Sequence, residues 1–298
     1  MLIANPIYDG VFKYLLDDNS VAKLFLSLIL DREIIELEFK PTEFRSKSDN
    51  TTRFITIFMI DFKAKIKNND GSEEIVIIEI QKAKFHTDIM RFRKYLGSQY
   101  CDENNVYPKN NDYETPKALP IISIYFLGHK LQHTTAPVIK VNREYIDIST
   151  KEKISEREEF IECLTHDSYI IQIPYLKPKR QSELLQVLSV FDQGNIQSNK
   201  HILNIDEDEL PEKYRGVIRR LQKAAAESDV RKIMDIEDSI IADMENTERK
   251  IAHLEKNAEE NKKALEKALK EKDKVLEAAI NFMMSQGMTR EEAMEKLK

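Results

Sequence analysis

The stretches Phe-Ile-Thr-Ile-Phe-Met-Ile-Asp (54–61) and Ile-Val-Ile-Ile-Glu-Ile-Gln (75–81) decide the fold of this chain. Both are rich in β-branched and aromatic residues, a composition typical of buried β-strands. Between them, residues 68–71 read Asn-Asn-Asp-Gly, which is a strong turn signal for a β-hairpin. We therefore predict two adjacent antiparallel strands.

Both runs end in polar side chains where a buried strand would carry apolar ones. Side chains alternate between the two faces of a strand, so Glu79 and Gln81 share one face, and the hairpin can bring Asp61 beside Glu79. Two carboxylates and an amide oxygen suit a hard cation such as Mg²⁺ or Mn²⁺, which prefers oxygen ligands and often binds beside a phosphate. The alternative is that Asp61 and Glu79 are ordinary strand-end residues in contact with water.

A basic segment follows the second strand. Residues 82–94 contain five basic side chains and one acidic side chain, namely Lys82, Lys84, Arg91, Arg93 and Lys94 against Asp88. Acidic ligands next to positive charge suit metal-assisted hydrolysis of a phosphodiester, in which the metal polarises the phosphate and activates water. A phosphodiester is therefore the predicted substrate class.

These features resemble the PD-(D/E)xK nucleases, in the branch of recombination-promoting nucleases and transposase-like proteins. Four short motifs in the expected order carry the resemblance: Asp61, Glu79-Ile80-Gln81, Arg91 with Tyr95, and the opening Asp9-Gly10-Val11-Phe12-Lys13. The resemblance spans roughly residues 5–175. The last position of the catalytic triplet is usually lysine, and here it is Gln81. Glutamine is common there in this branch, but its amide is neither a cation nor an acid.

The resemblance implies a restriction-endonuclease-like α/β fold, with a mixed sheet flanked by helices, that hydrolyses DNA phosphodiesters. Asp61, Glu79 and Gln81 would be the catalytic residues. The metal would be held by Asp61, Glu79 and the main-chain carbonyl of Ile80, with Asp9 completing its outer coordination, while Gln81 positions the attacking water. DNA phosphates would be contacted by Lys13, Lys82, Lys84, Arg91, Lys94 and Tyr95. For Asp9, Lys13, Arg91 and Tyr95 the alternative is helix capping and surface ion pairing.

The composition limits the class of protein. Of 298 residues, 41% are hydrophobic, which is enough for a sizeable core in one or two domains. The net charge of −6 argues against indiscriminate nucleic-acid binding, so a DNA site has to be a local patch. Two cysteines exclude a disulfide framework and a four-cysteine zinc site. The chain begins without the features of a signal peptide and has no apolar run long enough for a membrane span, so we expect a soluble cytoplasmic protein without membrane contact.

Other segments add helices and strands to the hairpin. Helical spacing predicts helices over residues 11–30, broken near 17–20 with Ser20 as a cap, and over residues 87–100. Residues 120–127 and 169–173 are two further predicted strands. This order predicts an α/β sandwich with a mixed sheet, and we assign residues 1–200 to the nuclease domain.

The remaining residues, 201–298, form a predicted helical extension. Residues 240–284 lack Gly and Pro, and their apolar residues keep a 3,4 spacing similar to that of a coiled coil, at Ile251, Leu254, Ala258, Leu265, Ala268, Val275, Ala279 and Phe282. Asn261 and Lys272 interrupt this stripe, so we predict a weak or two-stranded pairing, and through it a homodimer, rather than an independent rod. A long solvated helix packed on its own domain is the alternative. Gly287 and the sequence Thr289-x-x-Glu292 predict a helix end followed by a capped short helix.

The sequence therefore favours a Mg²⁺-dependent deoxyribonuclease, and the resemblance places it in DNA mobility or recombination. Because Gln81 replaces the usual lysine, a second hypothesis stays open. In it, a catalytically weak or inactive domain binds DNA, and its C-terminal helix recruits a partner.

Overall fold

The computed structural model describes residues 1–47, 54–68, 70–83, 89–108, 117–176, 182–197 and 199–297. Within these ranges, the side chains of residues 40–47, 54–60, 83, 91, 244, 245, 248, 252 and 293 are not described. The helices are α1 (Asp9–Leu16), α2 (Asn19–Leu30), α3 (Ile89–Cys101), α4 (Glu159–Leu164), α5 (Glu183–Leu188), α6 (Arg215–Ala226), α7 (Ser228–Ser285) and α8 (Arg290–Lys296). The strands are β1 (Leu2–Ala4), β2 (Glu33–Lys47), β3 (Phe54–Lys67), β4 (Glu73–Ala83), β5 (Ile121–Leu127), β6 (Val138–Val141), β7 (Tyr145–Ile146), β8 (Lys153–Ile154), β9 (His166–Gln172) and β10 (Ile202–Asn204).

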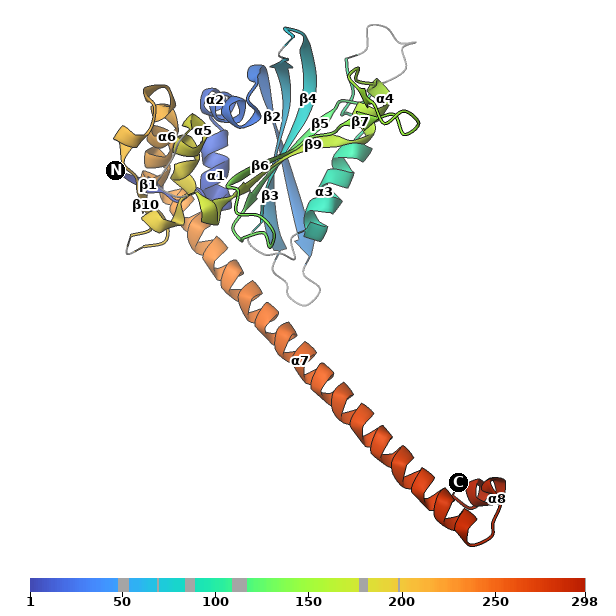
Figure 1. Ribbon diagram of the computed structural model, residues 1–298. Coiled ribbons are helices and arrows are strands. Elements are labelled where there is room, and N and C mark those ends of the chain that lie inside the picture. Colours follow the sequence, from blue (N-terminus) through green and yellow to red (C-terminus); the bar gives the residue numbers. More distant parts are fainter. Residues whose placement is uncertain are drawn as a thin grey trace. The chain divides into compact units, whose positions relative to one another are not determined.

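A mixed six-stranded sheet forms the centre of the chain and confirms the predicted α/β class (Figure 1). Its strand order is β2-β3-β4-β5-β9-β6. Strand β3 is antiparallel to both β2 and β4. Strands β4, β5 and β9 run parallel, and β6 is antiparallel to β9. Strand β4, which carries Glu79, is therefore an interior strand with neighbours on both sides.

The predicted hairpin joins β3 to β4. In its turn the Gly71 amide donates to the Asn68 carbonyl at 2.9 Å, and Gly71 has a φ of +85°, a left-handed conformation that glycine adopts without steric cost. The side chain of Asp70 accepts a hydrogen bond from the Ser72 amide at 2.9 Å and braces the turn. This turn sets the register in which Asp61 lies opposite Glu79.

The N-terminal helical region is broken where the sequence predicts, but a different residue caps the second helix. Helix α1 ends at Leu16 and α2 begins at Asn19. The carboxylate of Asp18, not the side chain of Ser20, accepts hydrogen bonds from the first amides of α2. Asp18 lies at the position that precedes the helix, where a short acidic side chain can reach those amides, whereas Ser20 is already inside the helix. The expectation that Ser20 is the cap was wrong.

One face of the sheet carries the main hydrophobic core, with α1, α2, α5 and α6 on that side (Figure 1). Successive residues of each strand alternate, so Ile78 and Ile80 of β4 point into this core. At its centre, the ring of Phe126 lies 5.1 Å from that of Phe12 and 5.0 Å from that of Phe191, measured between centroids. These spacings fall in the favourable range for aromatic pairs.

Helix α3 packs on the opposite face of the sheet (Figure 1). Its side of the sheet holds two small apolar clusters, one around Ile77 and Ile121 and one in which Phe92 stacks on Tyr125 with 5.1 Å between ring centroids. Because this face is only partly apolar, it leaves room for polar side chains between the clusters, and Glu79 lies among them.

The first compact unit extends to Glu237, beyond residue 200, where the composition changes. The unit extends this far because residues 201–237 contribute a paired strand and buried helix residues, which their polar composition does not suggest. Strand β10 pairs with β1 at the N-terminus, and α6 buries Val217, Ile218 and Leu221 against the main core. Residues Asp238–Lys298 form the second unit.

Gly10 lies where α1 packs closely against the beginning of α7. A Cβ added at Gly10 would lie 2.5 Å from Cγ2 of Ile233, a distance at which the Ile233 side chain or one of the two helices has to shift. We expect Gly10→Ala to destabilise the protein by about 1–3 kcal/mol, the usual cost of overpacking.

Equilibrium unfolding in urea measures this cost. Gly97→Ala in α3 is a matched control, because a Cβ there meets no atom within 4 Å, so it should leave stability unchanged or raise it slightly. Adding Ile233→Ala to Gly10→Ala should recover part of the loss. Equal stability of the Gly10 and Gly97 variants would show that the two helices do not make this contact.

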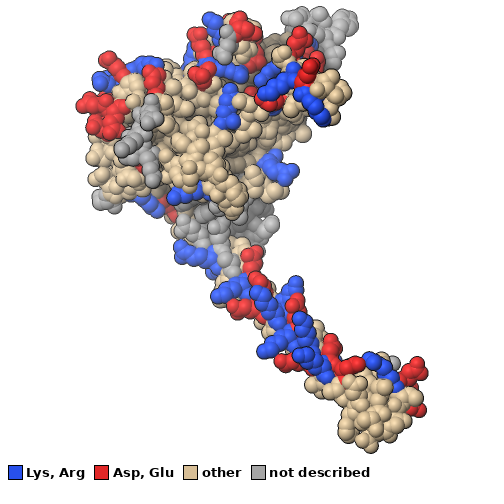
Figure 2. Space-filling view, viewed as in Figure 1, with Lys and Arg blue, Asp and Glu red and all other residues tan. Residues whose placement is uncertain are grey.

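The second unit consists of the rest of α7 and the short helix α8. Gly287 follows α7 with a φ of +93°, and Thr289 and Glu292 form the predicted capping box at the start of α8. Figure 2 shows basic and acidic side chains interspersed along this part of α7. The stripe of apolar residues is exposed, with Leu254 65% and Leu265 61% accessible. Across the described residues, none of the helices is both long and apolar enough to cross a membrane.

Candidate functional site

Asp61, Glu79 and Gln81 lie together on the α3 face of the sheet, as the alternation of side chains predicts. Asp61 and Glu79 are register partners on β3 and β4, and Gln81 follows Glu79 by two residues on the same face. Their exposed fractions are 1%, 0% and 6%, respectively. All three polar side chains are therefore buried rather than solvated at strand ends.

The hydrogen bonds of this group leave oxygen atoms available. The amide Nε2 of Gln81 donates to Oε1 of Glu79. The other carboxylate oxygen of Glu79, Oε2, and the amide oxygen of Gln81 are buried and have no hydrogen-bond partner among the described residues. Burial raises the pKa of Glu79 to about 8, with a further contribution from the neighbouring Asp61 and an opposing one from Gln81. Burial beside Asp61 therefore favours the protonated form of Glu79 in the metal-free site.

Asp61 is contacted from the helix that covers this face. The amide Nε2 of Gln99 in α3 donates to Oδ2 of Asp61 at 2.8 Å. In turn Nδ2 of Asn105, a buried residue in the loop after α3, donates to Oε1 of Gln99 at 2.8 Å. Two amide side chains thus connect the loop to the carboxylate.

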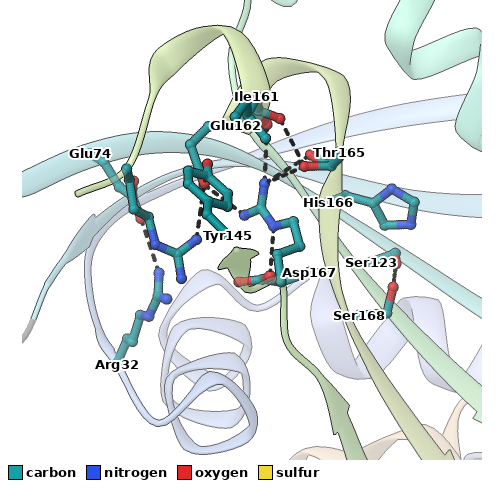
Figure 3. Close-up of polar contacts among 12 residues, drawn as sticks. Arg32, Glu74, Ser123, Tyr145, Ile161, Glu162, Thr165, His166, Asp167 and Ser168 are labelled. Carbon is teal, nitrogen blue, oxygen red and sulfur yellow. Dashed lines mark hydrogen bonds and ion pairs between the residues drawn. The ribbon is translucent and has the colours of Figure 1, made fainter. Parts of the chain in front are cut away.

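Further polar side chains continue from Glu79 across the neighbouring parallel strands. Ser123 of β5 is the register partner of Glu79, and its hydroxyl lies 2.9 Å from that of Ser168 on β9 (Figure 3). Tyr125 is the register partner of Gln81, and its burial raises its pKa. At the far end the hydroxyl of Tyr100 is 2.9 Å from Nδ1 of His166, whose pKa is lowered by burial and by Arg143. The α3 face therefore carries a continuous polar strip from β3 to β9.

The donor set at Asp61 and Glu79 fits a hard divalent cation. All the groups are oxygen donors, two are carboxylates, and two buried oxygens lack hydrogen bonds from the described residues. Within the described part of the chain, no group of three or more His, Cys, Asp or Glu side chains is able to hold a metal. A metal bound here would accordingly take its other ligands from Gln81, the main chain, water and substrate, as Mg²⁺ commonly does.

Asp9 and Lys82 form a separate cluster on the other face of the sheet. Lys82 adjoins Gln81 in β4 and so points to the opposite side. Its Nζ lies 2.8 Å from a carboxylate oxygen of Asp9, donates to the Ile7 carbonyl at 2.7 Å, and lies 5.1 Å from the ring centroid of Phe12. The carboxylate of Glu237 in α7 accepts hydrogen bonds from the Asp9 and Gly10 amides, each at 2.7 Å. These contacts join α1, β4 and the start of α7, and they do not bring Asp9 to Glu79.

The remaining residues proposed for DNA binding are dispersed. Tyr95 and Lys94 both belong to α3, where Tyr95 is 3% exposed and Lys94 is exposed. Lys13 is half-buried in the last turn of α1. Lys84 lies outside the described residues, and of Arg91 only the backbone, in α3, is described. Lys94 is thus the member of this set with a described, exposed side chain on α3.

Arg143, which is partly buried, contacts the residues at the end of α4 and the start of β9, of which Glu162, Thr165 and Asp167 are labelled in Figure 3. Arg143 contacts Asp167 through Nε at 2.9 Å and Glu162 through Nη2 at 2.8 Å, and it donates to the Thr165 carbonyl at 3.1 Å. The charge of Arg143 is therefore paired with two carboxylates, one of which, that of Glu162, also pairs with Arg157.

Sequence reasoning missed Gln99, Asn105, Tyr125 and the two serines of the polar strip. One signal for Gln99 was present, because it follows Tyr95 by four residues and so shares its helix face. Ser123 likewise is a polar residue within the apolar run of its strand. Asn105 carries no comparable signal, since its contact depends on how the loop folds back onto α3.

Comparison with protein-family models, curated proteins and solved structures finds no match to this chain.

Proposed function

We propose that the protein is a metal-dependent deoxyribonuclease with a restriction-endonuclease-like core. The observation that supports this most is the buried pair Asp61 and Glu79 on adjacent strands, next to Gln81 and with carboxylate and amide oxygens that receive no hydrogen bond from the described residues. A protonated Glu79 would exchange its proton for a cation, which is the usual linkage between metal binding and acidic ligands.

Each residue of the site has a role in this proposal. Asp61 and Glu79 would hold Mg²⁺ or Mn²⁺ together with the carbonyl of Ile80, and Gln81 would orient the attacking water through its amide. When bound, the metal polarises the scissile phosphate and lowers the pKa of water. Gln81 supplies no positive charge, so the contribution that lysine makes in related sites falls to other residues.

The proposed substrate is DNA, with the part of the basic segment 82–94 that lies on α3 near its phosphates. Lys94 and Arg93 are exposed on α3, the helix that covers the polar strip. Lys82 instead pairs with Asp9, so in this proposal it supports β4 rather than contacting phosphate. With a net charge of −6, binding would be confined to such a patch and would weaken steeply with salt.

Incubation of the full-length protein with supercoiled plasmid tests the proposal. Nicked or linear product that appears with Mg²⁺ or Mn²⁺ and not with a chelator supports the nuclease. Retarded plasmid without cleavage in either metal would favour the alternative, a DNA-binding module that is catalytically inactive because Gln81 replaces lysine.

We also propose that α7 pairs with a second copy of itself through its exposed stripe. Replacing Leu254 and Leu265 with lysine in the full-length chain should convert a dimer into a monomer, because charge in a two-stranded seam is unfavourable. Light scattering reports the mass, and Glu255→Lys with Glu266→Lys, beside the stripe, is the matched control. A monomeric wild-type protein would support the alternative for this helix, a long solvated helix packed on its own domain.

A further inference from the structure

The side chain of Gln99 is held at both ends of its amide. Its Nε2 donates to Asp61 at 2.8 Å, while its Oε1 accepts from Nδ2 of Asn105 at 2.8 Å. Asn105 uses the same Nδ2 to donate to the Gln99 carbonyl at 3.1 Å. The two residues therefore contact one another through both side chain and main chain.

Asn105 itself is fixed by the fold. It is 5% exposed, its amide donates to the Asp102 carbonyl at 3.0 Å, and its carbonyl accepts from the Leu119 amide at 2.9 Å. The second contact ties the loop after α3 to the segment that enters β5. Asn105 is thus anchored by its backbone, and its side-chain donor faces Gln99.

This arrangement fixes the direction of the Gln99 amide. Because Asn105 presents an N–H donor, Gln99 must turn its oxygen toward Asn105 and its own N–H toward Asp61. An amide N–H facing a carboxylate favours the ionised form, and hydrogen bonds to ionised groups are stronger than neutral ones. The loop thereby determines that Asp61 faces the N–H group of the Gln99 amide and not its oxygen.

We propose that Asn105 and Gln99 are positioning residues that hold Asp61 in the orientation required to bind a divalent cation. The inference rests on the proposed function, because it concerns the same metal centre, and it adds two residues outside the nuclease motifs. Hydrogen-bonded partners behind a metal ligand typically change metal affinity by 10–100-fold.

Asn105→Asp is the sharpest test because it keeps the size of the side chain and reverses its hydrogen bonding. The introduced carboxylate can only accept, so Gln99 would turn its N–H toward that carboxylate and its oxygen toward Asp61. We expect this variant to bind Mn²⁺ roughly 10–100-fold more weakly in titration calorimetry without DNA. A merely electrostatic effect has the opposite sign, since an added negative charge near the site would strengthen cation binding.

Asn104→Asp is the matched control. Asn104 is exposed, and its side chain contacts Asp102 within the loop rather than Gln99, so the variant adds the same charge without reaching the Gln99 amide. We expect Mn²⁺ affinity to be unchanged or slightly higher than that of the wild type. Urea unfolding of each metal-free variant reports whether the fold is retained. If Asn105→Asp does not fold, the Mn²⁺ affinity of Gln99→Met is measured instead. This substitution removes the hydrogen-bond donor to Asp61 and keeps the length of the side chain.

The outcomes separate the inference from the proposed function. Weaker Mn²⁺ binding in Asn105→Asp, with a normal Asn104→Asp, supports the positioning role. Equal Mn²⁺ affinity in a folded Asn105→Asp (or Gln99→Met) and in the wild type would overturn it and leave the metal centre intact. A wild-type protein that binds no Mn²⁺ would overturn the metal centre and, with it, this inference.

Discussion

Replacement of Asp61 or Glu79 by alanine is expected to abolish metal-dependent plasmid cleavage. A bound metal contributes several kcal/mol of charge stabilisation in the transition state, and each 1.36 kcal/mol is a factor of ten in rate, so we expect losses on the order of 10³-fold or more. The measurement is the initial rate of plasmid nicking at fixed Mg²⁺, with folding verified by circular dichroism.

Glu73→Ala is the control for this pair of substitutions. Glu73 lies at the exposed end of the same strand and pairs with Lys65, so its loss removes a surface ion pair that contributes little. It should cut plasmid at the wild-type rate. If Asp61→Ala or Glu79→Ala also cuts at that rate, the carboxylate pair is not the active site.

The hairpin and its polar residues could be predicted from sequence because the causes are local. The turn at residues 68–71 and the period of two along each strand together determine that Asp61, Glu79 and Gln81 share a face. The same alternation directs the side chains of Gln81 and Lys82 to opposite faces of the sheet. It therefore explains why Lys82 contacts Asp9 on the face away from α3.

Strand β2 was not predicted, although Leu37 and Phe39 alternate with acidic residues in a pattern typical of a half-buried strand. A register shift between Ile34 and Glu36 breaks the period, and Pro41 argues against an interior strand. The structure resolves the conflict by placing β2 at the edge of the sheet, where proline is tolerated.

Long-range contacts account for the other differences. Residues 201–237 are polar in composition, yet β10 and α6 belong to the first unit because β1 and α1, at the opposite end of the chain, pack against them. The link from Asn105 through Gln99 to Asp61 is also tertiary, because it joins a loop, a helix and a strand that are distant in sequence.

The second large effect concerns the stability of the metal-free protein. Glu79→Gln should make unfolding less dependent on pH, because burial and Asp61 raise the pKa of Glu79 to about 8. The unfolded chain loses the Glu79 proton near its ordinary pKa of 4.5, whereas the folded chain keeps it until about 8. Wild-type stability should therefore fall as pH rises across this window and level off above it.

The size of the effect follows from the same linkage. A pKa shift of this magnitude corresponds to a decrease in the free energy of unfolding on the order of 4 kcal/mol between acidic and alkaline pH. The substitution Glu79→Gln should remove most of this pH dependence. Urea unfolding of both proteins from about pH 5 to pH 9 measures the difference between their free energies of unfolding. The titrations of the histidines and of Glu237 largely cancel in this difference, because both proteins contain these residues. Mn²⁺ should restore wild-type stability at the alkaline end and do little for Glu79→Gln. Parallel stability curves for the two proteins would mean that Glu79 is already ionised in the folded state, and the exchange of its proton for a cation would then lose its basis.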